Sequence, residues 1–511
     1  MLKFLVYEDG QPATDWQLRE AHLLGADDVG IRAQIRFEEG MITCDKSHLG
    51  AVAFALQFAV GDDAGDLMLQ TCLLPERDEP YLLSLELARH RLMRIISKQE
   101  EWHLFDLEAH SPLADRIAEA KAAFVEALCN AHLPAEADRL ARQALRLGLD
   151  ASEELALVQA NLVLQRRRET GHVSRNVLGC GIRLPDDDPR AQQALLENFD
   201  YIRIPMPWRI LEPAEQEYDW QYVDAWCEWA FRNRMPIVAG PIVSFTPDVV
   251  PDWLYIWEHD YETIRDLLYE HIERLVTRYR SVVALWDVIS GVHVNNNFAF
   301  NFEQLMDLTR MAVTVVKKVQ PTARTLVEIT QPFGEYYARN QRSIPPLMYA
   351  EMVLQSGIPF DGYGLKLVMG QPAEGGRTRD LMQLSALLDK YHSLGRSIHV
   401  SGIAVPSEPV AVQVAAEPEP HAAALEETQK HESSDGGYWR EPWSDKVQAD
   451  WVDAAYRVVL SKPFIESVSW LEMTDAADSE LPGGGLLKAD YQPRPALGRL
   501  RDLHHWLHEP V

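Results

Sequence analysis

The stretch Ala284-Leu-Trp-Asp-Val-Ile-Ser-Gly291 has the composition of a buried β-strand that ends at a glycine. From residue 176 onward, short β-branched runs of this kind alternate with segments of helical periodicity, such as 261–279 and 302–319. The predicted strands cover residues 177–183, 199–204, 236–243, 282–288, 325–329, 362–368, 398–405 and 467–473. Eight strands separated by helices predict an α/β fold, the (β/α)8 or TIM barrel. An open doubly wound sheet is the alternative, but no Gly-x-Gly-x-x-Gly loop follows any of these runs.

The N-terminal part of the chain has a different pattern. Alternating runs at 2–7, 30–37, 51–60 and 67–74 are separated by turn signals such as Gly61-Asp-Asp-Ala-Gly65. They predict an antiparallel, β-sandwich-like module over residues 1–110. Residues 111–175 change to a helical period and predict a helical bridge, with an apolar stripe from Leu113 to Leu128 and further helices over 134–147 and 152–168. The barrel is expected to cover residues 176–511.

A long segment, residues 405–448, interrupts the barrel pattern. Proline, alanine and glutamate dominate its first half, and its second half contains Tyr438, Trp439 and Trp443. We expect an expanded loop after the seventh strand, on the catalytic face of the barrel. Its first half is predicted to be a disordered surface insertion, and its tryptophans to be packed or to contact a ligand.

Composition and charge exclude several classes of partner. The 49 basic and 77 acidic residues give a net charge of -28, which repels nucleic acid and anionic membranes. No apolar run reaches the length of a membrane span, and the N-terminus lacks the pattern of a signal peptide, so we expect a cytoplasmic protein. The five cysteines lack CxxC spacing, so reduced thiols are expected, with no metal and no cofactor. They are Cys44, Cys72, Cys129, Cys180 and Cys227.

Several motifs follow one another through the barrel half of the chain. They are Ile210-Leu-Glu-Pro213 with Tyr218-Asp-Trp220, Pro251-Asp-Trp-Leu254, Trp286-Asp-Val288, Phe360-Asp-Gly-Tyr-Gly-Leu365, Thr474-Asp475 and Tyr491-Gln-Pro-Arg-Pro-Ala496. In this order they resemble the family 10 glycoside hydrolases, the β-1,4-xylanases. The resemblance does not reach the first 175 residues.

The resemblance implies two catalytic glutamates at strand ends, and the chain has neither. In the family the acid/base glutamate closes Trp-Asp-Val-Val-Asn-Glu on strand four, and the matching positions are Ser290 and Gly291. The nucleophile belongs to a Thr-Glu-Leu-Asp pattern on strand seven, where this chain has Ser401-Gly402-Ile-Ala404. A retaining glycosidase needs both carboxyl groups, about 5 to 5.5 Å apart. Hydrolysis by the family's route is therefore expected to be lost.

The polar residues around the cleavage site change as well. The family's glutamine and histidine on strand six fall on Lys366 and Val368, and its strand-three histidines fall on Pro241 and Thr246. Because these groups would grip the sugar undergoing cleavage, the resemblance implies a site replaced as a whole.

Other residues near the predicted strand ends are candidates for relocated chemistry or for binding. The fallback catalytic carboxyl groups are Glu472, Glu328 and Asp287, each with a structural salt bridge or a backbone hydrogen bond as the alternative. Tryptophan stacks on sugar rings or packs in cores, so both roles are open for the tryptophans. The candidate ligand-binding residues are Trp208, Trp253, His293, Asn295, Lys366, Trp439, Trp443 and Trp470.

These observations predict a xylanase-like barrel protein that has lost glycosidic-bond hydrolysis. It would act as a carbohydrate-binding or protein-interaction pseudoenzyme. One alternative is an active glycoside hydrolase that cleaves a β-linked glycan with relocated carboxylates. Another is a structural subunit of a homo-oligomer. The expected partners are accordingly a carbohydrate or further copies of the chain.

Overall fold

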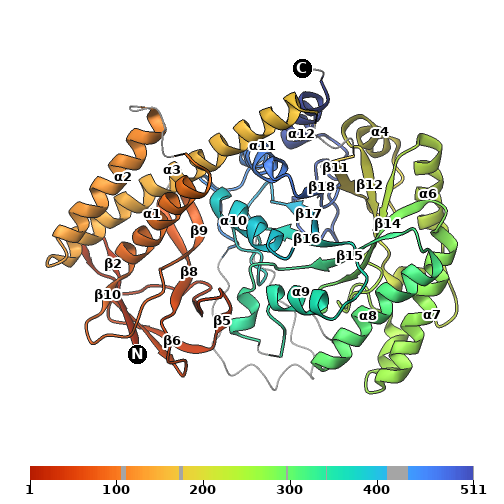
Figure 1. The fold of residues 1–511 in the computed structure, drawn as a ribbon, viewed down its shortest axis with the longest axis horizontal. Coiled ribbons are helices and arrows are strands. Elements are labelled where there is room, and N and C mark those ends of the chain that lie inside the picture. Colours follow the sequence, from red (N-terminus) through yellow and green to blue (C-terminus); the bar gives the residue numbers. More distant parts are fainter. Residues whose placement is uncertain are drawn as a thin grey trace.

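The computed structural model describes residues 1–61, 63–104, 111–171, 176–294, 297–340, 342–410 and 435–509. A barrel and an N-terminal module lie side by side, and a long helix extends from one to the other (Figure 1). No helix among these described residues is long and apolar enough to cross a membrane.

The barrel is a closed ring of eight parallel strands, β11 to β18 in chain order, and β11 pairs with β18 to complete it. The strands are β11 (Leu178–Gly181), β12 (Tyr201–Ile204), β13 (Ile237–Ala239), β14 (Val283–Ser290), β15 (Arg324–Ile329), β16 (Gly362–Val368), β17 (Ser397–Ala404) and β18 (Ile465–Trp470). Each lies within or overlaps one of the eight runs expected from the sequence. The TIM barrel is confirmed.

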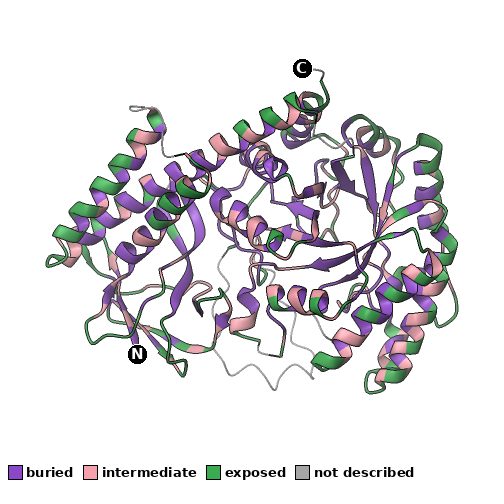
Figure 2. Cartoon of the chain, in the orientation of Figure 1, coloured by how far each residue is buried: buried purple, intermediate pink, exposed green. Residues whose placement is uncertain are grey.

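Helices surround the strands and turn their apolar sides inward, as the buried residues in Figure 2 show. In α8, Leu305, Leu308 and Ala312 form a buried stripe at helical spacing, and Asn301 with Gln304 forms a capping box at its start. The barrel helices are α4 (Pro189–Asn198), α5 (Trp208–Leu211), α6 (Gln221–Asn233), η1 (Asp252–Trp257), α7 (Tyr261–Tyr279), α8 (Phe302–Val319), η2 (Glu335–Ala338), α9 (Pro346–Gln355), α10 (Leu381–His392), α11 (Asp445–Ser461) and α12 (Pro495–His508).

The N-terminal module contains two four-stranded sheets, ordered β10-β1-β7-β6 and β5-β4-β8-β9. Their shared core includes a stacked pair, Phe4 and Phe54, with ring centroids 4.9 Å apart. The module is rich in strands, as expected, and β10 pairs parallel to β1. Its strands are β1 (Leu2–Leu5), β2 (Tyr7–Glu8), β3 (Gln11–Pro12), β4 (His22–Leu24), β5 (Gly30–Ile31), β6 (Ala33–Glu38), β7 (Met41–Lys46), β8 (Ala53–Gly61), β9 (Gly65–Gln70) and β10 (Tyr81–Leu82).

The helical bridge differs from the expectation in two ways. Helix α1 (Leu83–Glu101) lies in the range predicted to be β-rich, and α3 (Pro134–Glu169) is one continuous helix where two were predicted; α2 is Pro112–Cys129. A Cβ at Gly148 would lie only 3.1 Å from Cγ of Arg91, so α1 approaches α3 closely there. Tertiary packing of this kind overrides the low helix propensity of glycine. Helix α3 then continues along the barrel, where it contacts α10 and α11.

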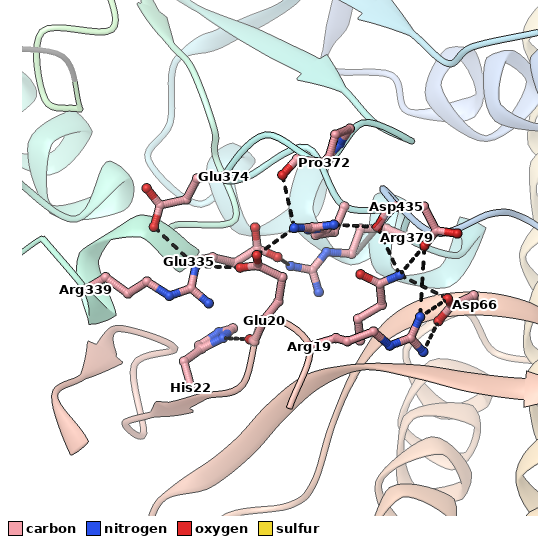
Figure 3. Close-up of polar contacts among 12 residues, drawn as sticks. Arg19, Glu20, His22, Asp66, Glu335, Arg339, Pro372, Glu374, Arg379 and Asp435 are labelled. Atoms are coloured by element: carbon pink, nitrogen blue, oxygen red, sulfur yellow. Dashed lines mark hydrogen bonds and ion pairs between the residues drawn. The ribbon is translucent and has the colours of Figure 1, made fainter. Parts of the chain in front are cut away.

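Ion pairs join the module to the barrel loops (Figure 3), and backbone hydrogen bonds add to them. Glu20 of the module accepts from Arg377 at 2.7 Å and also pairs with Arg339, both from the barrel. The backbones of Asp66 and Tyr438 exchange two hydrogen bonds, of 2.9 and 3.0 Å. The second half of the 405–448 segment is therefore held against the module.

Candidate functional site

A buried arginine crosses the interior of the barrel. Arg203 on β12 donates from Nη2 to Oε2 of Glu328 on β15 at 2.8 Å, and to Asp287 on β14. Its Nη1 donates to the backbone oxygen of Ser401 on β17 at 2.7 Å. The Asp287 and Glu328 side chains are 0% and 2% exposed. One guanidinium therefore links four strands and holds two of the three fallback carboxyl groups away from solvent.

The pKa values of the two carboxyl groups shift in opposite directions. Burial raises the pKa of Glu328, but the charges of Arg203 and Lys366 and hydrogen bonds from serines outweigh it and lower that pKa to about 2. Burial and the neighbouring Glu328 charge raise the pKa of Asp287 well above its ordinary value, and Arg203 only partly offsets this. Glu328 is accordingly the stronger anionic partner of Arg203, and Asp287 has the higher tendency of the two to hold a proton.

Glycines occupy both strand ends where the resemblance implies catalytic glutamates. Gly291 is buried and has a φ of 67°, a left-handed conformation that favours glycine. A Cβ at Gly402 would lie 3.0 Å from Cδ1 of Leu471 and 3.7 Å from Cγ of Lys366. Ser290, beside Gly291, donates from Oγ to Glu328 at 2.6 Å. The backbone at Gly291 thus favours glycine, and a longer side chain at Gly402 would require Leu471 to shift.

Beyond the buried arginine, Lys366 and Glu472 lie in a more accessible environment. Lys366 donates to Oε2 of Glu480 at 2.6 Å, so its ion-pair partner is neither Glu328 nor Glu472. Burial raises the pKa of Glu472, and the charge of Glu480 adds to that effect. A carboxyl group with a raised pKa has the property that a general acid needs, so Glu472 stays a catalytic candidate.

Most of the candidate tryptophans lie in the core, where each indole N–H has a protein acceptor. Trp208, Trp439, Trp443 and Trp470 are all at most 4% exposed. The donor–acceptor pairs are Trp208 to Glu212 at 2.7 Å, Trp439 to Glu153 at 2.6 Å, Trp443 to the Gly437 oxygen at 2.8 Å and Trp470 to the Gly484 oxygen at 2.9 Å. Trp253 is partly exposed and donates to the Glu212 oxygen at 2.9 Å. Packing accounts for the four buried rings.

Of the two polar candidates after β14, His293 is buried and therefore not accessible to a ligand from solvent. His293 is 1% exposed, its Nε2 lies 3.0 Å from the Thr330 oxygen, and its ring stacks on Tyr349 with centroids 5.1 Å apart. Burial lowers the pKa of His293 to about 4, so its ring is neutral near pH 7. Asn295 lies outside the described residues, as does 411–434 within the long loop.

A cavity on the module went unrecognised in the sequence. It has a volume of about 370 Å³ and lies between the sheets and helix α3. Trp16 and Phe58 supply aromatic rings, and Arg142 reaches over the Phe58 ring at 5.0 Å. The other lining residues are Glu8, Asp15, Gln17, Arg19 and Ala59. The only sequence signal was a tryptophan between two polar residues, Asp15-Trp-Gln17, in a loop.

Comparisons with known proteins agree with the barrel. The glycosyl hydrolase family 10 model matches residues 186–497. Endo-1,4-beta-xylanase A of Xylanibacter ruminicola is 27% identical over 115 residues, which cover 21% of this chain and 31% of the relative. Endo-1,4-beta-xylanase A of Caldicellulosiruptor saccharolyticus is 22% identical over 237 residues, 44% of this chain and 66% of the relative. The chain thus spans less than two thirds of the length of either relative.

The chain is also similar to solved structures of xylanases. Xylanase 10B from Thermotoga petrophila RKU-1, in complex with xylobiose, has a TM-score of 0.48 and 15% identity, covering 68% of this chain and 97% of that one. Native xylanase 10B from Thermotoga maritima has a TM-score of 0.47 and 15% identity, covering 67% and 98%.

Proposed function

The chain belongs to glycosyl hydrolase family 10, and from that membership we propose that it binds a carbohydrate without cleaving glycosidic bonds. One observation carries the proposal: the ends of β14 and β17 carry Gly291 and Gly402, while the nearby carboxyl groups of Asp287 and Glu328 are bound by Arg203. Hydrolysis needs one carboxyl group that protonates the leaving oxygen and a second that acts as nucleophile or base. Buried groups that pair with an arginine serve neither role.

The cavity on the module supports the binding half of the proposal. Its volume of about 370 Å³ is within the range of small-molecule sites, roughly 300 to 1,000 Å³. The half-buried Trp16 ring can cover the apolar face of a sugar. Carboxylate and amide groups of Glu8, Asp15 and Gln17 lie around it and can bind hydroxyl groups.

A binding experiment tests this assignment. Isothermal titration of the full-length protein with β-1,4-linked xylo-oligosaccharides should show binding, and Trp16→Ala should abolish it. Trp257→Ala is the matched control because Trp257, at the end of η1, is 36% exposed and outside the cavity. Absence of binding, or binding that Trp16→Ala leaves intact, would contradict the cavity assignment.

The second candidate function is hydrolysis with relocated carboxylates, and Glu472 favours it. The pKa of Glu472 is raised by burial and by Glu480, the arrangement that keeps a general acid protonated. If this candidate is right, the same titrations release reducing ends, and Glu472→Gln stops the release. The homo-oligomer alternative stays a prediction.

A further inference from the structure

Two histidines of the last helix and an aspartate converge where the barrel strands begin. His504 and His508 lie one turn apart on α12, and Asp200 immediately precedes β12. Oδ1 of Asp200 is 2.8 Å from Nε2 of His504 and 3.6 Å from Nε2 of His508. The two imidazole rings stack with centroids 4.5 Å apart. Three strong metal ligands therefore face one point.

We propose that Asp200, His504 and His508 bind a divalent transition-metal ion, with zinc as the best-fitting ion. One ligand atom from each residue lies within 4.8 Å of the others. Tetrahedral zinc with bonds of about 2.0 to 2.1 Å places its ligand atoms roughly 3.3 Å apart. The measured separations of 2.8 and 3.6 Å fall on either side of that value. Two imidazoles and one carboxylate are a donor set that zinc and its neighbours in the first transition series accept.

The carboxylate of Asp200 contacts both imidazoles, at two different distances. The 2.8 Å contact is an ordinary hydrogen bond between His504 and Asp200. The second imidazole nitrogen, of His508, lies 3.6 Å from the same oxygen, which is beyond hydrogen-bond length. A shared ion at the centre of the three groups accounts for both contacts at once.

The surrounding backbone holds the carboxylate in place. Oδ2 of Asp200 accepts hydrogen bonds from the backbone nitrogens of Val177 and Leu178, at 3.0 and 2.9 Å. This leaves Oδ1 directed at the histidines, as outer hydrogen bonds orient ligands in metal sites. The His508 side chain is 31% exposed, so the ion has a route from solvent and an open position for water.

The position of the site indicates a structural role. Val177 and Leu178 lead into β11, which pairs with both β12 and β18 and so closes the barrel. An ion held by Asp200 and α12 would fasten the last helix to the strands at this closure. In TIM barrels the end at which the strands begin contributes to stability, and the catalytic residues lie at the opposite end. The inference therefore departs from the sequence-based expectation of no metal and is independent of the proposed function.

Zinc titration of the chelator-treated, full-length protein tests the site. Calorimetry should show one zinc ion per chain. At a free zinc concentration 100 times Kd, the folded-to-unfolded ratio should rise about 100-fold and the melting temperature should increase. His508→Ala should remove both effects, because it deletes one of the three ligands at an exposed position.

His505→Ala is the matched control, because His505 lies on the same helix, is exposed and is not one of the three ligands. This variant should bind one zinc ion as the wild type does. No zinc binding by the wild type, binding retained in His508→Ala, or binding lost in His505→Ala would each overturn the site. Because thermal stability and calorimetry report on zinc alone, these outcomes are separate from any result with carbohydrate.

Discussion

Nη2 of Arg203 lies 2.8 Å from Oε2 of Glu328 in the interior of the barrel, with Glu328 only 2% exposed. This ion pair connects β12 to β15, and hydrogen bonds of the same guanidinium reach β14 and β17. Glu328, one of the fallback catalytic carboxyl groups, is thereby engaged in joining strands of the barrel. Breaking a buried pair of this kind leaves an uncompensated charge.

The first prediction concerns Glu328→Gln. We expect the free energy of unfolding at pH 7 to fall by up to about 3 kcal/mol. This is the lower end of the range for breaking a buried ion pair, because Arg203 keeps Asp287 as a second partner. The folded-state pKa of Glu328 is about 2, below its ordinary value of 4.5. Its stabilisation is therefore present above pH 4.5 and disappears as the pH falls toward 2. Urea denaturation across this range should show that the free energies of unfolding of wild type and variant converge at acid pH. A difference that stays constant with pH would contradict the ion pair.

The second prediction concerns Asp287→Asn. The contribution of Asp287 to stability changes with pH in the opposite direction to that of Glu328. The folded-state pKa of Asp287 is raised above its ordinary value of 3.8. Its contribution to stability is present below pH 3.8 and is lost as the pH rises through the folded-state value. Asparagine keeps the group neutral, so the variant should gain stability relative to wild type as the pH increases. Thermal melting between pH 5 and 9 checks this, and a relative loss with rising pH would refute it.

The third prediction is that restoring the glutamates does not restore hydrolysis. Gly291→Glu places a side chain at φ 67°, where a non-glycine residue costs roughly 1 to 2 kcal/mol. Gly402→Glu brings its Cβ to 3.0 Å from Leu471, which must shift. We expect both variants to melt at lower temperature than wild type and to release no reducing ends. Stable variants with xylanase activity would show that the site had changed only at these two positions.

The fourth prediction tests how the bridge is joined to the barrel. Arg91 on α1 donates to both oxygens of Asp380, which is fully buried at the start of α10. We expect Arg91→Ala to lower the free energy of unfolding by about 3 to 5 kcal/mol. Arg139→Ala is the control, because its pair with Glu136 is solvent-exposed and contributes little. Equal effects of the two variants in guanidinium denaturation would contradict this account.

The fifth prediction separates packing from ligand binding at Trp439. Its indole nitrogen donates at 2.6 Å to the buried Glu153 on α3. Trp439→Phe keeps most of the packing but removes the donor, which should cost about 1 to 3 kcal/mol. Oligosaccharide affinity should stay at the wild-type value. A weakened affinity with unchanged stability would assign Trp439 to a ligand site.

The barrel could be predicted because its strands are short, β-branched runs between amphipathic helices, and all eight were located. Helix α1 was missed because its start, Leu83-Ser-Leu-Glu-Leu, alternates as a strand does. The continuity of α3 past Gly148 depends on α1 packing against it, which no local pattern contains.

The candidate site was predictable only in part. Glu328 and Asp287 could be located on their strands, but their joint pairing with Arg203 depends on the geometry of the closed barrel. A charged residue within Tyr201-Ile-Arg-Ile204 was the available signal, because an arginine in a buried strand requires anionic partners. Asp200 and His504 are about 300 residues apart, so only the fold brings them together.

The most direct test of the central claim is chromatography of an end-labelled β-1,4-xylohexaose after long incubation with the full-length protein under conditions where calorimetry detects binding. We predict that the hexaose is recovered intact. Shorter labelled products that form with the wild type and disappear with Glu472→Gln would contradict the claim and identify this member of the family as a hydrolase with a relocated carboxylate.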